Sequence, residues 1–430
     1  TAALTGGVAT LSTVPAPSGV HGLTASFAGS ATLAAASGAT SVEVDPRLGA
    51  PVQVNTTKAG SQQHAAIATL ADGSSVVVWQ SAGQDGSDLG VYGQRRSAAG
   101  ARLGTEFRVA TTTAGAQSQP AVAALKGGGF VVVWQSAGQD GSGLGVYLKR
   151  YAANGTAQGT ETIAATTTKG DQQAPAVAAL ADGGFVVAWQ SAPTATSPST
   201  IRARRWSAAG VPAGPDFRAD TTTTTGQTAP TVAGLEAGGF LIAWVSTGSG
   251  GSTTIRGQAF TAAAAKAGGE VAISTSTVGG RSQPVLAPIA GGGAVAVWTT
   301  SGQTGATRSL FLQRLGPAAT RVGGETRVVS QVAGDQTEPS VAGFPAGGFV
   351  VAWTAKSGTV TAVRQRRFRG DGTAADVDLP MELAAAKAFG QPAVTVTSGT
   401  AFSVVFTAAA PVGAAEEIEV QRHGLAVAAP

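Results

Sequence analysis

The stretch Gly128-Gly129-Phe130-Val131-Val132-Val133-Trp134 decides the fold, because versions of it recur along the whole chain. Each copy ends on an aromatic residue, and these residues are Trp79, Trp134, Trp189, Trp244, Trp298, Trp353 and Phe406. The steps between them range from 53 residues (406 − 353) to 55 residues (134 − 79). Such a period is longer than that of two-helix repeats and is typical of a four-stranded propeller blade.

Each repeat contains four segments with strand character. A short first strand of small and apolar residues is expected at 119–125, followed by a glycine-rich turn. The second strand covers 130–134, and the side chains that point to either of its two faces are apolar. Both faces of this second strand are therefore predicted to be buried between neighbouring blades. The third strand covers 145–151, and the polar segment near 161–163 suits an outermost strand. The sequence predicts an all-β fold, a single seven-bladed β-propeller of four-stranded antiparallel blades, with the repeated tryptophans packed between sheets.

The two ends of the repeat array complement each other. Residues 48–56 match the outer strand at 103–111 but come before the first blade, whereas the seventh repeat ends on its third strand at 417–422. We therefore predict that 48–56 pairs with 417–422 and closes the ring. The predicted domains are an N-terminal extension at 1–44 and the propeller at 45–430.

The N-terminal extension, residues 1–44, consists almost entirely of Ala, Thr, Ser, Gly and Val. One interpretation is a loosely packed leader. The other is an arm that forms strands and adds to a sheet edge of another copy of the protein.

Composition excludes several classes of function. The net charge is only +4, and no run of Lys and Arg with interleaved aromatic residues occurs, which argues against a nucleic-acid partner. The absence of cysteine excludes disulfides and thiolate metal sites. No apolar run reaches membrane-spanning length, so the chain is predicted not to span a membrane.

One polar position, three residues before the proline of the first strand, is a candidate ligand site. It is occupied by Gln62, Gln117, Gln172, Gln227 and Gln336. On the rim of a central channel, these amides would hold a polar ligand such as a sugar. The alternative, which the near-equivalence of the copies favours, is that each glutamine bonds the backbone of the neighbouring blade.

Two Gly/Asp/Ser loops are candidates for a calcium site. Their carboxylates belong to Asp85, Asp88 and Asp140, and carboxylates with tight glycine turns are suited to Ca²⁺. The equivalent loops at 191–199 and 246–253 lack aspartate, which favours simple turns.

Enzyme motifs are absent from the sequence. The three histidines, His21, His64 and His423, have no His-Glu-x-x-His partner, and there is no Gly-x-Ser-x-Gly elbow. The sequence therefore predicts that the protein is not an enzyme, has no catalytic residues and needs no cofactor beyond the candidate calcium.

The run Phe-Val-Val-Val-Trp-Gln-Ser-Ala-Gly-Gln-Asp-Gly-Ser-Gly-Leu-Gly-Val-Tyr at 130–147 resembles β-propeller repeats of large secreted bacterial proteins, often found beside hemolysin-type calcium-binding repeats. The resemblance implies a bacterial protein that is secreted or on the cell surface. We expect a non-enzymatic structural or adhesive protein that self-assembles through its arm, with further copies or other extracellular matrix or surface proteins as partners. The alternative is a glycan-binding propeller whose channel rim takes a polysaccharide.

Overall fold

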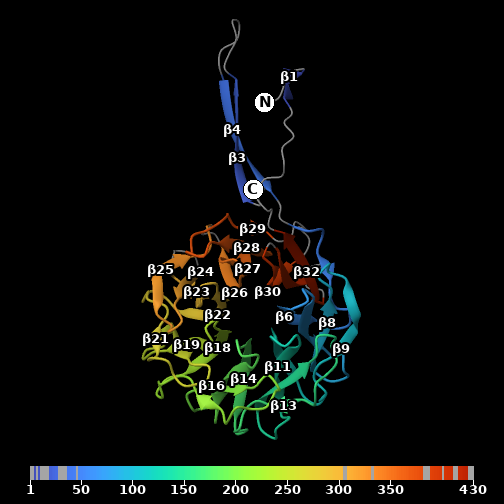
Figure 1. Cartoon of the computed structure of the whole chain (residues 1–430), viewed down its shortest axis with the longest axis vertical. Coiled ribbons are helices and arrows are strands. Elements are labelled where there is room, and N and C mark those ends of the chain that lie inside the picture. The colour runs from blue at the N-terminus through green and yellow to red at the C-terminus, as the bar shows by residue number, and fades with distance from the viewer. Residues whose placement is uncertain are drawn as a thin grey trace.

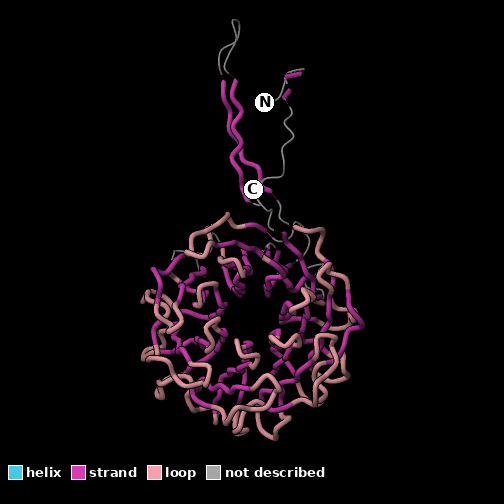
Figure 2. The backbone as a smooth tube through the Cα atoms, viewed as in Figure 1, coloured by secondary structure: helices cyan, strands magenta, loops and turns pink. Residues whose placement is uncertain are grey.

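The computed structural model describes residues 47–424 except 304–307, 331–333, 381–387, 400 and 410–414, together with the backbone of four strands in the first 44 residues. Within these residues every regular element is a β-strand, and Figure 2 shows strands and loops alone. Seven four-stranded antiparallel sheets stand around a central axis (Figure 1). The predicted seven-bladed propeller is confirmed.

In the first four blades the strands are arranged in sequence order, with the first strand at the channel and the fourth at the outside. Blade 1 contains β6 (Gln62–Thr69), β7 (Ser75–Ala82), β8 (Leu89–Arg96) and β9 (Arg102–Arg108). Blade 2 contains β10 (Gln117–Ala124), β11 (Phe130–Ala137), β12 (Leu144–Tyr151) and β13 (Thr162–Ile163). Blade 3 contains β14 (Asp171–Ala179), β15 (Phe185–Ala192), β16 (Thr200–Trp206) and β17 (Phe217–Arg218). Blade 4 contains β18 (Gln227–Gly234), β19 (Phe240–Thr247), β20 (Thr253–Phe260) and β21 (Val271–Ala272).

The remaining blades follow the same order until the last, which takes its outer strand from the start of the ring. Blade 5 contains β22 (Arg281–Ile289), β23 (Gly293–Ser301), β24 (Arg308–Leu315) and β25 (Arg321–Arg327). Blade 6 contains β26 (Asp335–Gly343), β27 (Phe349–Ser357), β28 (Val360–Phe368) and β29 (Leu379–Pro380). Blade 7 contains β30 (Ala388–Ser398), β31 (Ala401–Ala409), β32 (Glu417–Gly424) and β5 (Val52–Gln53).

The second strand of each blade forms the core between neighbouring sheets. In β11 the side chains from Phe130 to Trp134 have no exposed surface, and all seven strand-closing aromatic residues are equally buried. Phe130 stacks on Tyr151 of the third strand, and Phe185 stacks on Trp206 in the next blade. The predicted packing role of the aromatic residues is therefore confirmed.

The ring is closed by β5, as predicted from the sequence. Val52 and Gln53 pair with β32, and the backbone N–H of Val54 donates to the carbonyl of Ile418 at 2.7 Å. The carbonyl oxygen of the Asn55 side chain accepts from the N–H of Ile418 at 2.9 Å, and Gln53 Nε2 donates to Glu417 at 2.9 Å. Side chains and backbone together fix the register of the closing strand.

An outer-strand carboxylate joins each of six blades to the blade before it. It accepts a hydrogen bond from a backbone N–H that follows the outer strand of that earlier blade, and the pairs are Thr56–Glu106, Thr111–Glu161, Thr166–Asp216, Thr221–Glu270, Thr275–Glu325 and Ser330–Asp378. Burial acts to raise the pKa of Glu161, Asp216 and Glu270, but hydrogen bonds outweigh it, and each pKa lies below its ordinary value. These bonds come from the threonines after the earlier blade and from one side chain of the same blade, which is Gln139, Arg202 or Arg256.

These lowered pKa values predict acid-sensitive contacts between blades. A carboxyl group whose folded-state pKa is depressed stabilises the fold above its unfolded pKa of about 4, and this contribution is lost as the pH falls through the folded-state pKa. We expect Glu161→Gln to lower the free energy of unfolding by about 1 kcal/mol at neutral pH and by much less near pH ~3. Urea unfolding across pH checks this, with the exposed Glu236→Gln as control. An equal loss at both pH values would contradict it.

The N-terminal extension contributes two antiparallel hairpins. β1 (Leu4–Thr5) pairs with β2 (Val8–Ala9), and β3 (Gly19–Phe27) pairs with β4 (Ala36–Val44). Figure 1 shows the β3–β4 hairpin outside the ring, where its edges can add to another sheet. Self-assembly through this arm and the domain division after residue 44 stay predictions. No helix in the described part of the chain is long and apolar enough to span a membrane.

Candidate functional site

The first strand of every blade carries one residue in the left-handed backbone conformation. Its φ lies between 49° and 53° at His64, Gln119, Ala174, Ala229, Gln283, Glu338 and Gln391. At each of these positions the pairing with the second strand shifts by a β-bulge. We call these seven residues the bulge ring.

The bulge ring places polar side chains at the channel. A bulge redirects a side chain, and a non-glycine residue with positive φ costs on the order of 1 kcal/mol, so neighbouring contacts must hold it. The backbone N–H of His64 donates to Gln391 Oε1 at 2.9 Å, and that of Gln391 donates to Glu338 Oε2 at 2.9 Å. The N–H of Glu338 in turn donates to Gln283 Oε1 at 3.1 Å. One chain of side chains thus links blades 5, 6, 7 and 1.

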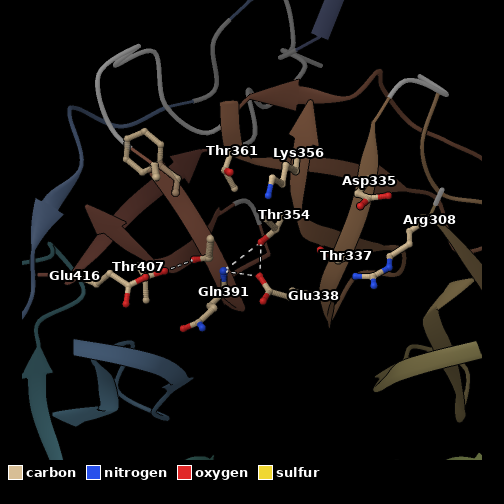
Figure 3. A pocket seen from close by; sticks show the side chains of 13 residues that line it. Arg308, Asp335, Thr337, Glu338, Thr354, Lys356, Thr361, Gln391, Thr407 and Glu416 are labelled. Atoms are coloured by element: carbon tan, nitrogen blue, oxygen red, sulfur yellow. Dashed lines mark hydrogen bonds between the residues drawn. The ribbon is translucent and has the colours of Figure 1, made fainter. Parts of the chain in front are cut away.

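A hollow of about 400 Å³ opens beside this chain, between blades 5, 6 and 7. We call it the mouth hollow. Figure 3 shows Glu338, Thr354 and Gln391 joined by hydrogen bonds, with Lys356 and Thr361 on the blade 6 wall. The remaining polar lining comes from Arg308, Asp335, Thr337, Thr407 and Glu416. The hollow lies on the face that carries the loops between the second and third strands.

Charged groups of both signs line the mouth hollow, three carboxylates and two cations. Glu338 Oε2 accepts from Thr354 Oγ1 at 2.7 Å as well as from the Gln391 backbone, which fixes the carboxylate in place. Glu416 accepts a hydrogen bond from the Gln63 side chain of blade 1. Lys356 and Arg308 are exposed, so their heads can reach a ligand.

His64 is the only ionisable member of the bulge ring besides Glu338. Burial among the blades lowers the pKa of the imidazole below its ordinary value, although the nearby carboxylates of Glu338 and Glu416 act to raise it. The lowered pKa favours the neutral imidazole of His64, which has one nitrogen that accepts a proton. A neutral histidine beside two carboxylates can move protons to and from a bound ligand.

The bulge ring also lines the central channel, where a second hollow of about 500 Å³ contains His64, Gln119, Gln283, Glu338 and Gln391. It shares Glu338 and Gln391 with the mouth hollow. The opposite end of the channel is a hollow of about 560 Å³ with apolar residues, lined by Leu125, Leu180, Leu235, Ile289 and Phe344 among others. The two ends of the channel therefore differ in chemistry.

The structure corrects the predicted rim position. Gln62, Gln117, Gln172, Gln227 and Gln336 are at most 5% exposed and lie inside the blades. Gln62 Oε1 accepts from Trp79 Nε1 at 3.0 Å, and its amide donates to the carbonyls of Ala59 and Gly60 in its own loop. The favoured alternative, bonding to the neighbouring blade, is also wrong for Gln62. The residue whose side chain faces the channel is the one directly before the proline, because the bulge at that residue turns its side chain inward.

The aspartates proposed for calcium cap their own turns. Asp85 accepts from the N–H of Ser87 and Asp140 from that of Ser142, each at 3.1 Å, while Asp88 is exposed. No group of three or more His, Cys, Asp or Glu side chains in the described residues is arranged to hold a metal ion. The turn interpretation therefore fits these loops better than a metal site.

No family model and no curated protein matches this sequence. Solved structures share its fold at low identity. A protein of unknown function from Dyadobacter fermentans has a TM-score of 0.56 and 10% identity over 87% of this chain and 98% of its own. An ulvan lyase, a polysaccharide lyase, has a TM-score of 0.54 and 9% identity over 88% of this chain and 94% of its own. The NanB sialidase of Streptococcus pneumoniae has a TM-score of 0.47 and 9% identity over 89% of this chain and 71% of its own.

These matches correct the prediction that the protein is not an enzyme. The ulvan lyase, which resembles it over most of the chain, is an enzyme, so the lack of a sequence motif carries no such conclusion. In a propeller, the side chains of a functional site come from different blades, so they do not form a short motif in the sequence. At about one tenth identity the likeness itself shows the fold and assigns no activity.

Proposed function

We propose that the protein recognises a polysaccharide at the mouth hollow. The observation that carries this proposal is the lining, in which Glu338, Glu416, Lys356, Gln391 and Thr354 present donors and acceptors to one open space (Figure 3). Hydroxyl groups of sugars both donate and accept, and they match such a mixed set. The setting, at a bacterial surface or outside the cell, is part of the proposal.

The dimensions support a polymer rather than a single sugar. The mouth hollow lies within the usual range for ligand pockets, about 300–1,000 Å³. It shares Glu338 and Gln391 with the channel hollow, and Arg308 with a further hollow on blade 5. A chain of sugar units can therefore lie across the blades with successive units in adjoining hollows.

Cleavage of the bound polysaccharide is a second candidate function. It is favoured by His64, whose lowered pKa favours the neutral imidazole and which lies near Glu338 and Glu416. Such a set supplies a proton acceptor together with carboxylates that can hold or return a proton. The fold is one that a polysaccharide lyase also adopts.

A blocked hollow tests the proposed recognition. Thr361 lies on the wall of the mouth hollow, so Thr361→Trp fills part of it without removing a buried group. We expect polysaccharides bound by the unmodified protein on a glycan array to be lost by this variant, with at least about a tenfold weaker affinity in calorimetry. Val211→Trp, an equally bulky change at an exposed turn of blade 3, is the control.

Two outcomes would contradict the proposal. One is the absence of binding to any glycan on a broad array by the full chain. The other is unchanged binding by Thr361→Trp, because a ligand whose affinity is not affected by a bulky side chain at this position does not lie in the mouth hollow. Release of new chain ends from a bound glycan, measured in the same samples, would establish the second candidate.

A further inference from the structure

Blade 5 departs at one buried position from the five blades that have glutamine there, as does blade 7 with Phe389. Arg281 stands where five blades have the buried glutamine, and its side chain is only 2% exposed. Its two terminal nitrogens donate to the carbonyls of Gly279 and Ser276, and Nε has no hydrogen-bond partner within the described residues. Arginine has donors alone, so it cannot accept from Trp298 Nε1 as Gln62 does from Trp79. The substitution therefore leaves a buried cation with an unused donor.

No carboxylate forms an ion pair with this cation among those of the described residues. The charge of Glu325 acts on Arg281 from nearby, but the carboxylate accepts from the backbone N–H groups of Thr275 and Ser276. A buried charge without a hydrogen-bonded counter-charge is costly, so an anion bound directly to the guanidinium would stabilise this position.

Arg281 lines a hollow of about 470 Å³ together with Arg308. We call it the blade 5 hollow. Its other polar side chains are hydroxyls and one amide, from Thr253, Ser282, Gln283, Thr299 and Ser301, and its lining contains no carboxylate. Thr299 Oγ1 donates to Gln283 Oε1 at 2.9 Å, and Thr253 Oγ1 accepts from the Arg281 N–H at 2.7 Å. The charged side chains of this hollow are therefore all cationic, whereas the adjoining mouth hollow has three carboxylates beside its two cations.

We propose that the blade 5 hollow binds the carboxylate of a uronic acid unit, with Arg281 and Arg308 as its cations, so that the ligand is an acidic polysaccharide. This rests on the proposed glycan recognition and names its substrate class. Arg308 lines both hollows. A uronic acid unit in the blade 5 hollow would therefore be adjacent along the polysaccharide to a sugar unit in the mouth hollow. The neighbouring unit there meets carboxylates and is expected to be uncharged.

The test compares the unmodified chain with Arg281→Gln, which introduces the residue that five other blades have at this position and gives Trp298 an acceptor. The probes are polygalacturonate and the same polymer with its carboxylates methyl-esterified. We expect Arg281→Gln to bind polygalacturonate at least about tenfold more weakly and the ester unchanged. Arg321→Gln, which removes an exposed charge from the same blade, should change neither affinity more than about twofold.

Binding of a single uronic acid tests this inference independently of the proposed polysaccharide recognition. Free galacturonate should raise the melting temperature of the unmodified protein and not that of Arg281→Gln, even where no polymer binds and the polysaccharide proposal fails. An equal loss of affinity for acid and ester would overturn the inference. So would an Arg281-dependent affinity for a sulfated glycan without any for the uronate.

Discussion

Deletion of residues 1–57 is expected to destabilise the whole ring. The deletion removes β5 together with Val54 and Asn55, both at most 1% exposed. Burial of Val54 contributes about 2 kcal/mol. The hydrogen bonds of Gln53, Val54 and Asn55 to blade 7 add roughly 1 kcal/mol each. Their loss also exposes the edge of β32, and we expect the melting temperature to fall by about 10 °C or more.

The comparison that isolates the closing strand is a shorter deletion. Removal of residues 1–40 takes away most of the N-terminal extension and leaves β5 paired with β32. We expect its melting temperature by calorimetry to stay within about 2 °C of the full chain. Equal melting temperatures for the two deletions would show that pairing of β5 with β32 does not hold the ring together.

The second large effect concerns the carboxylates of the mouth hollow. Glu338→Gln with Glu416→Gln keeps the shapes and one acceptor oxygen at each position but removes two charges that face the ligand. A hydrogen bond to a charged group contributes about 1.5–3 kcal/mol, so we expect the double variant to bind its polysaccharide on the order of 100-fold more weakly. Titration calorimetry measures this against Glu236→Gln with Asp88→Asn, a pair of exposed carboxylates outside the hollow.

The fold of the double variant needs its own check. A glutamine at 338 can still accept from the Gln391 N–H and from Thr354, so its unfolding transition should stay cooperative. Full affinity in a folded double variant would show that these carboxylates do not contact the ligand.

The architecture follows from the sequence because it depends on local pattern and constant spacing. The apolar run that ends at Trp134 needs neighbours on both faces, and its recurrence about every 55 residues supplies them. The match of 48–56 to 103–111 likewise predicts the closing strand, since an outer strand without a blade of its own has one free edge to join.

The site could not be predicted in the same way. The bulge before Pro120 turns Gln119 into the channel and leaves Gln117 inside the blade, whereas the prediction placed Gln117 on the rim. In a regular strand these two residues would share one face, so the bulge is what separates them. The sequence does contain one indication of the channel-facing position, which is a polar residue directly before the first-strand proline. Four blades have it, as Gln119, Gln283, Glu338 and Gln391. The mouth hollow itself joins side chains from three blades, and no single segment records that arrangement.

The most direct test is a crystal structure of the full chain with an oligosaccharide cut from the polymer that it binds. Recognition at the mouth hollow predicts density for a sugar unit within hydrogen-bond distance of Glu338 and Lys356, continuing past Arg308 toward Arg281. Density at the apolar end of the channel near Phe344, or on the outer strands alone, would contradict it.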